Sequence, residues 1–288
     1  MKYYFVSDLH GCNPDIVKSA LNAQGFDAAA DTLVVLGDIC DRGPYTMQLI
    51  DYVLSLPHTI FVRGNHDTRT WKVINGSHYQ NYDKHNGVGA SLASILGWEA
   101  EQCARNLLWL ASTELEHDRH TRKEVKDNIE KFYQYIHRTV WGIEFNDLIA
   151  IHAWLPYNAA KPELLPVSQW SALSWDDATW SDVEKLMDWQ LYPHKKMIIG
   201  HWHAWRLHLK AAGIDINKAL AADTEVNFGI YEDDHLIAID PCVNYSNMVN
   251  VYVYQSDDEP LIYSDNRTIP FSTWQLFLES QKEYHYVQ

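Results

Sequence analysis

The sequence has few basic side chains and no long apolar run. Its 288 residues contain 23 Lys and Arg against 38 Asp and Glu, which gives a formal net charge of -15. Nucleic acids and anionic membranes are bound through basic surfaces, so neither partner is expected. No segment approaches the roughly eighteen consecutive apolar residues of a membrane span. Met1 and Lys2 lead directly into a predicted strand without a signal sequence, so a cytoplasmic location is predicted.

Cysteine is also scarce. The four cysteines, Cys12, Cys40, Cys103 and Cys242, have no CxxC spacing. This pattern is typical of reduced thiols in a cytosolic protein and gives no indication of a disulfide framework or a thiolate metal site.

Three apolar runs are each followed by a turn that contains glycine and charged or polar side chains. The runs are residues 3–7, 33–36 and 59–63, and the turns are Asp-Leu-His-Gly at 8–11, Gly-Asp-Ile-Cys-Asp-Arg-Gly at 37–43 and Gly-Asn-His-Asp at 64–67. Such runs are predicted to be buried strands. Ligands bind at the carboxyl ends of the strands in open α/β sheets, so the three turns are predicted to meet at one edge of a sheet.

The segments between these runs predict an α/β fold. Helices are predicted from Pro14 to Gly25 and from Pro44 to Pro57, and they make the connected strands parallel. The alternating pattern is lost over about 68–138, where helices at 90–96, 100–112 and 123–136 form a predicted helical insertion. We therefore expect one α/β domain over 1–288 that contains this insertion.

The second half of the chain is predicted to contain further strands. The expected elements are strands at 140–145, 148–151 and 196–199, a helix at 177–191, antiparallel strands at 226–231, 236–240 and 249–254, and a short helix at 273–278. Two of the strands end in histidines: His152 follows the first, and Gly200-His201-Trp202-His203 follows the second.

Five strand ends thus provide oxygen and imidazole donors and no thiolate. The donors are Asp8, His10, Asp38, Asn65, His152, His201 and His203. Each one alone is weak evidence, because an Asp or His after a strand is more often a helix cap. Together they suit Mn, Fe or Zn. Two metals about 3.5–4 Å apart need a shared ligand, and a carboxylate such as Asp38 can bridge them.

These motifs, in this order over residues 8–203, resemble the calcineurin-like metallophosphoesterases. Asp-Arg-Gly at 41–43 resembles the phosphoprotein phosphatase branch and its bacterial and phage relatives, which include diadenosine tetraphosphate hydrolases. The resemblance implies a β-sheet sandwich flanked by helices and two divalent ions, with Mn favoured over Fe or Zn.

The resemblance also implies residue roles. Asp8 and His10 would bind the first metal, Asp38 would bridge, and Asn65, His152 and His201 would bind the second, with His203 either a further ligand or a neighbour of one. His66 would act as general acid, oriented by Asp41, and Arg42 and Asn65 would contact the phosphoryl group. Phosphoryl transfer does require cations, an in-line nucleophile and a proton for the leaving group.

The leading functional hypothesis is a serine/threonine or dual-specificity protein phosphatase in which a metal-bridging hydroxide attacks the phosphomonoester. The substrate would be a phosphorylated protein or peptide, or a small phosphoester. The alternative is a dinucleoside-polyphosphate hydrolase, which uses the same metals and also needs a pocket for a base. A non-catalytic metal-binding protein is disfavoured, because Asp41, Arg42 and His66 would then have no use.

Two features leave the substrate open. A second phosphate-binding arginine is expected, and Arg63, Arg69, Arg138 and Arg206 are the candidates. The aromatic series Trp170, Trp175, Trp180 and Trp189 is predicted to pack, although a base-stacking platform there would favour a nucleotide.

Overall fold

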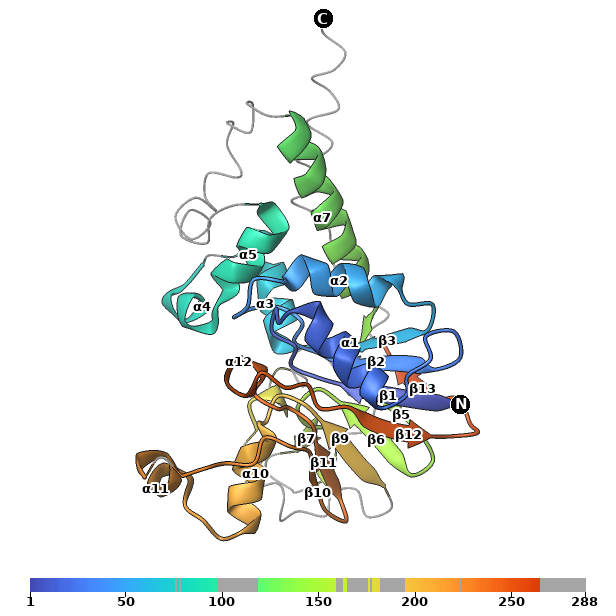
Figure 1. Cartoon of the computed structure of the whole chain (residues 1–288), viewed down its shortest axis with the longest axis vertical. Helices are drawn as coiled ribbons and strands as arrows, with labels where there is room; N and C mark the ends of the chain where they lie inside the picture. Colours follow the sequence, from blue (N-terminus) through green and yellow to red (C-terminus); the bar gives the residue numbers. More distant parts are fainter. Residues whose placement is uncertain are drawn as a thin grey trace, which may run out of the picture.

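The computed structural model describes residues 1–75, 77, 79–97, 119–158, 163–164, 176, 178–181, 195–222 and 224–264. Two β-sheets lie face to face, with helices over the outer face of the first and α10 (Ala204–Ala211) beside the second (Figure 1). The predicted α/β sandwich is thereby confirmed. Within the described residues, no helix is long and apolar enough to cross a membrane.

The first sheet has the strand order β12-β1-β2-β3-β4. Its strands are β12 (Tyr252–Gln255), β1 (Lys2–Val6), β2 (Thr32–Leu36), β3 (Thr59–Val62) and β4 (Thr139–Val140). β1 to β4 pair in parallel, whereas β12 pairs antiparallel with β1. The helices α1 (Pro14–Ala23) and α2 (Thr46–Ser55) connect the first three strands as predicted, although α2 begins two residues after Pro44.

In the described residues between β3 and β4 there are four helices. They are α3 (Asn65–Ile74), α4 (Asn81–Asn86), α5 (Val88–Leu96) and α7 (Arg119–His137). The predicted helices at 90–96 and 123–136 are confirmed, while the one at 100–112 lies outside the described residues. Buried side chains of α2, α5 and α7 pack in one cluster with β1 to β3. The assignment of the whole chain to one domain stays a prediction.

The second sheet has the strand order β10-β11-β9-β6-β5-β13. Its strands are β10 (Tyr231–Glu232), β11 (Leu236–Ala238), β9 (Lys196–Ile199), β6 (Leu148–Ile151), β5 (Gly142–Glu144) and β13 (Leu261–Tyr263). β11, β9 and β6 are parallel to one another. A two-stranded ribbon of β7 (Tyr157–Asn158) and β8 (Glu163–Leu164) follows β6, and α11 (Ile216–Ala221) and α12 (Val243–Ser246) lie beyond α10.

Successive side chains of each strand face opposite sides of the sheet, and this alternation explains how the layers pack. In β1, Tyr4 and Val6 face the cluster under the helices, whereas Tyr3 and Phe5 face a cluster that also contains Ile198 of the second sheet. Both faces of the strand are therefore buried, which explains why its sequence is a continuous apolar run.

Several predictions for the second half were wrong. The strand expected at 140–145 is divided, because β4 ends in the first sheet and β5 begins in the second. The strand expected at 226–231 contains only Tyr231, and β11 pairs in parallel with β9 as well as antiparallel with β10. The helices α10 and α11 were not predicted. The helix at 273–278 and most of that at 177–191 lie outside the described residues.

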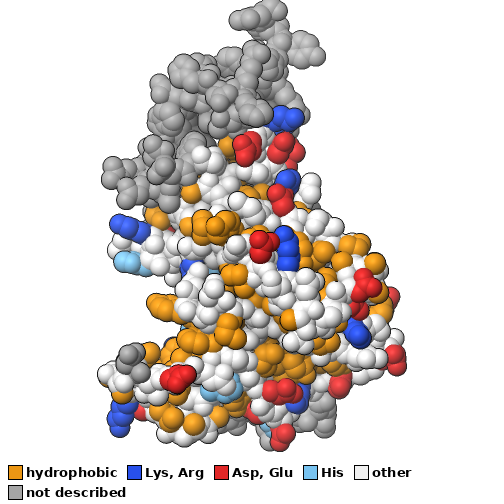
Figure 2. Space-filling model, viewed as in Figure 1, with side chains coloured by type: hydrophobic (Ala, Val, Ile, Leu, Met, Phe, Trp, Pro, Cys, Tyr) orange, Lys and Arg blue, Asp and Glu red, His pale blue; other side chains and the backbone are white. Residues whose placement is uncertain are grey.

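The surface agrees with the charge expected from the composition. On the face shown in Figure 2, acidic and basic side chains are interspersed among apolar ones, and no large basic patch is visible. Among the described residues on this face, basic side chains are therefore not gathered into one patch.

Candidate active site

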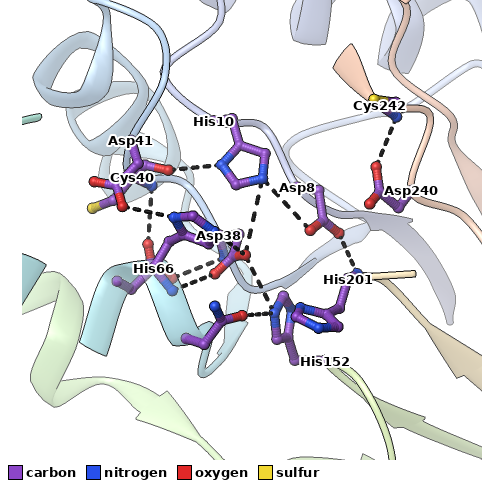
Figure 3. Close-up of polar contacts among 12 residues, drawn as sticks. Asp8, His10, Asp38, Cys40, Asp41, His66, His152, His201, Asp240 and Cys242 are labelled. Atoms are coloured by element: carbon purple, nitrogen blue, oxygen red, sulfur yellow. Dashed lines mark hydrogen bonds and ion pairs between the residues drawn. The ribbon is translucent and has the colours of Figure 1, made fainter. Parts of the chain in front are cut away.

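The turns after β1, β2, β3, β6 and β9 converge where the carboxyl ends of the two sheets meet. Figure 3 shows their side chains pointing toward one another around Asp38. Two groups of three side chains have potential ligand atoms within 4.8 Å of one another: His10, Asp38 and His66, and Asp38, His152 and His201. Asp38 belongs to both groups, which is the position expected of a bridging ligand.

His10 and Asp8 lie on one side of Asp38. His10 Nε2 is 3.8 Å from Asp8 Oδ1 and 3.9 Å from Asp38 Oδ2. His10 Nδ1 lies 2.9 Å from the Cys40 carbonyl oxygen and donates to it, which leaves Nε2 free to bind a cation. The other Asp8 oxygen accepts a hydrogen bond from the His201 backbone N–H at 2.8 Å. This bond joins the two sheets at the site.

His152 and Asn65 lie on the other side of Asp38. His152 Nε2 is 3.4 Å from Asp38 Oδ2 and 2.9 Å from Asn65 Oδ1. Its Nδ1 donates to the Leu36 carbonyl oxygen at 2.6 Å, which again orients Nε2 toward the site. The His201 ring lies beside the His152 ring, with 5.2 Å between their centroids.

His66 forms a separate pair with Asp41. His66 Nδ1 donates to Asp41 Oδ2 at 2.7 Å, and His66 Nε2 lies 4.0 Å from Asp38 Oδ2. The other Asp41 oxygen accepts a hydrogen bond from the Thr70 hydroxyl at 2.8 Å, and the Asp41 N–H donates to Ser91 Oγ at 2.6 Å. The imidazole is therefore held by a fixed carboxylate, with Nε2 directed into the site.

Arg42 is exposed at the rim of the same turn. Its backbone N–H donates to the Gly87 carbonyl oxygen at 3.3 Å. In the described part of the chain its guanidinium makes no ion pair and no hydrogen bond. An arginine that is anchored by its backbone and unpaired at its side chain is suited to bind an anion.

His203 does not join either donor group. Its Nδ1 lies 2.7 Å from Asp240 Oδ2, and its Nε2 is 3.7 Å from the Cys242 thiol. Asp240, which sequence reasoning missed, is buried and lies close enough to Asp8 to influence its pKa. It follows the apolar end of β11 just as Asp8 follows β1, and this pattern was the available signal.

The candidate phosphate-binding arginines differ in position. Arg138 donates to Thr59, the first residue of β3, and so lies at the edge of the sheet opposite the site. Arg69 binds both oxygens of Asp83, at 2.6 and 2.5 Å. The Arg63 guanidinium lies over the Trp141 ring, and that of Arg206 over Trp202.

The turns of the site adopt an unusual backbone conformation. Six non-glycine residues of the site have positive φ angles between 42° and 76°: Asp8, His10, Asp38, Asp41, Arg42 and His201. Left-handed conformations are uncommon for such residues and persist only where the surroundings fix them. The turns also approach one another closely, since a Cβ atom on Gly64 would lie 2.2 Å from the Asp38 backbone nitrogen.

The electrostatics of the site favour a bound cation. Burial and the charge of Asp240 raise the pKa of Asp8 to about 8. Burial alone would raise the pKa of Asp38, but His152 and His66 outweigh it and hold that pKa well below its ordinary value. Burial and the neighbouring His152 lower the pKa of His201 to about 3, so its ring is neutral and available as a ligand. Buried carboxylates and imidazoles gathered around Asp38 form a donor set that fits divalent ions.

Comparisons with known proteins agree with this geometry. The model of the calcineurin-like phosphoesterase family matches residues 1–205. Curated relatives are named symmetrical bis(5'-nucleosyl)-tetraphosphatases. The one from Nitrosomonas europaea is 34% identical over 118 residues, covering 41% of each chain. The one from Klebsiella pneumoniae (strain 342) is 40% identical over 78 residues, covering 26% of this chain and 27% of the relative. The matches thus span about two fifths or less of these relatives' length.

Solved structures with a related shape include a putative diadenosine tetraphosphatase, with a TM-score of 0.46, 17% identity and coverage of 92% of this chain and 95% of that one. Another is a Saccharomyces cerevisiae serine/threonine phosphatase described as similar to human phosphatase PP5. Its TM-score is 0.48 and its identity 13%, with coverage of 90% of this chain and 81% of that one. The family match covers more than half of the sequence and includes all five turns of the site, so the chain belongs to the calcineurin-like phosphoesterase family.

Proposed function

We propose that this metal-dependent hydrolase cleaves dinucleoside polyphosphates, with diadenosine tetraphosphate as the representative substrate. One observation supports the chemistry above all: two donor groups share Asp38, and His66, which belongs to one of them, is hydrogen-bonded to Asp41. The choice of substrate rests on the printed names of the curated relatives. These names favour the nucleotide alternative over the protein phosphatase that the sequence first suggested.

The contacts support the following residue roles. Asp8 and His10 would hold one ion, Asn65, His152 and His201 would hold the other, and Asp38 would be shared between them. Ions bound by these residues would supply positive charge for the phosphoryl oxygens and would lower the pKa of a water molecule. His203 is omitted from this assignment, because its ring is directed at Asp240 and Cys242.

The remaining polar side chains act on the substrate. His66 Nε2 gives a proton to the oxygen that leaves, while Asp41 keeps the imidazole oriented. Arg42 binds the phosphoryl oxygens from the rim of the site. The Asn65 amide lies in the same turn as His66. Water adds to phosphorus as the P–O bond to the leaving diphosphate breaks. Symmetrical cleavage of diadenosine tetraphosphate then gives two ADP molecules.

The test compares two substrates on one preparation. Mn-loaded protein is incubated with diadenosine tetraphosphate and, separately, with phosphoserine and phosphothreonine peptides. We expect a higher kcat/KM on the dinucleotide and ADP as the only nucleotide product. Asp38→Asn, which weakens both donor groups together, should abolish the activity. Rapid release of phosphate from the peptides without cleavage of the dinucleotide would overturn the proposal in favour of a protein phosphatase.

A further inference from the structure

Trp180 is a large aromatic side chain that lies beside the site and remains exposed. Its relative exposure is 68%. Its ring centroid is 5.7 Å from that of His201, and the two rings are nearly perpendicular at 82°. They are therefore not stacked on each other, and most of the indole surface is open to solvent. Exposure of an indole to water is unfavourable, because aromatic side chains contribute much of the free energy that is gained when apolar surface is buried.

The backbone around Trp180 is fixed. Thr179 and Ser181, on either side, are 2% and 5% exposed. Ala178 is buried in the cluster that also contains Trp154, and the Ser181 N–H donates to the Ala178 carbonyl oxygen at 3.2 Å. Buried neighbours on both sides direct the indole outward, so its exposure follows from the packing of the turn.

The position of Trp180 relates it to the substrate. His201 belongs to the donor group formed with Asp38 and His152, which the proposed function places at the reacting phosphoryl group. Because the Trp180 ring lies next to the His201 ring, a group that extended from the phosphoryl group past His201 would reach the indole. In a nucleotide, such a group is the ribose with its planar base. Bases stack on exposed aromatic side chains largely irrespective of sequence, because every base has a π face.

We propose that Trp180 forms the base-binding part of the site by stacking on a purine of the substrate. The proposal rests on the proposed function and adds the residue that distinguishes a nucleotide from other phosphate esters. The related residues Trp170, Trp175 and Trp189 lie outside the described part of the chain, so the assignment concerns Trp180 alone.

The experiment compares inhibitors with and without a base. ADP and methyl diphosphate present similar phosphates, but only ADP has a purine. In Trp180→Ala, inhibition by ADP should weaken about 5- to 140-fold, which corresponds to the range for base stacking on aromatic side chains. Inhibition by methyl diphosphate should stay within about twofold. KM for diadenosine tetraphosphate should rise more than kcat falls.

Further variants separate stacking from packing. Trp180→Tyr should restore most of the ADP affinity, whereas Trp180→Leu, which is apolar but not aromatic, should not. Leu220→Ala serves as the control, because Leu220 is an exposed apolar residue on α11. If the Trp180→Ala protein does not fold, the comparison of Trp180→Leu with Trp180→Tyr tests the proposal. Equal ADP affinity in the Leu and Tyr variants, or equal loss for both inhibitors, would overturn the assignment. Failure of the wild-type protein to cleave the dinucleotide would instead overturn the proposed function.

Discussion

His66 has one ring nitrogen bound to a buried carboxylate and the other directed at Asp38. Burial lowers the pKa of His66, but the charges of Asp38 and Asp41 outweigh it and raise that pKa above its ordinary value. The ring thus retains a proton that it can give away, which is the state required of a general acid.

Replacement of His66 should therefore matter most for poor leaving groups. His66→Asn is expected to slow hydrolysis of phenyl phosphate by roughly 10²–10⁴-fold, the usual contribution of general acid catalysis. The rate on p-nitrophenyl phosphate, whose leaving group needs little protonation, should fall much less. Metal analysis of the variant provides the control and should show an unchanged content. Equal losses on both substrates would remove His66 from this role.

A substitution of Arg42 provides a second test, of its role in phosphate binding. Its guanidinium has no described partner, so Arg42→Lys should leave the Tm unchanged. Because lysine cannot bind two oxygens with one planar group, competitive inhibition by inorganic phosphate should weaken by about 1–3 kcal/mol. Arg69→Lys is the matched control, since Arg69 binds Asp83 and its variant should lower the Tm instead. Unchanged phosphate inhibition in a folded, metal-loaded Arg42→Lys protein would contradict the assignment.

Among the elements, α7 is linked to the site through Tyr135. The Tyr135 hydroxyl of α7 donates to Asp67 Oδ2 at 2.7 Å. The same oxygen accepts the Asp38 backbone N–H at 2.9 Å, and Asp67 Oδ1 accepts the Cys40 N–H at 3.0 Å. Asp67, in the first turn of α3, therefore holds the turn that contains Asp38. Tyr135 and Asp67 position this turn without contacting the substrate.

Removal of the Tyr135 hydroxyl should loosen this turn. Tyr135→Phe leaves a buried carboxylate with one donor fewer, at a cost of about 1–3 kcal/mol. We expect a lower Tm and weaker Mn binding, measured by thermal unfolding and by metal titration. Tyr4→Phe is the control, because the Tyr4 hydroxyl donates to the Gly25 carbonyl oxygen beyond the end of α1. It should affect the Tm alone. Unaltered Mn binding in Tyr135→Phe would show that the contact only supports packing.

The sequence predicted the elements whose signals are local. Apolar runs and glycine-containing turns located β1, β2 and β3 and the donors that follow them. Strand pairing between distant segments could not be predicted in this way. The tail was expected to be antiparallel, and the carboxyl end of an antiparallel strand would lie at the opposite edge of the sheet. Asp240 was missed for that reason, since β11 in fact runs parallel to β9. The position of His203 depends on Asp240 and was left open with it.

In the whole molecule, both sheets contribute donors to the site. Asp8 and Asp38 come from the first sheet, and His152 and His201 come from the second. Ions bound between them should therefore stabilise the folded chain against unfolding, because the unfolded chain lacks the assembled site.

Chelation should accordingly lower the Tm. At a free metal concentration 100 times Kd, each bound ion contributes about 2.7 kcal/mol. For a chain of this size, the Tm should fall on the order of 5–10 °C per ion when metal is removed. Thermal unfolding with and without EDTA measures the shift, and metal analysis should find two equivalents per chain. Asp38→Asn should show a much smaller shift. Identical unfolding curves for loaded and chelated protein would contradict a shared site between the sheets.

The pairing of β1 with β12 has a consequence for how the chain is made. β1 lies between β2 and β12, and its residue Lys2 pairs with Gln255. β1 is synthesised long before β12, so one of its edges has no partner until residue 255 has been synthesised. Unpaired strand edges can associate with other chains. The strand that leads to Asp8 is thus translated well before the strand that covers its second edge, so nascent chains need protection during that interval.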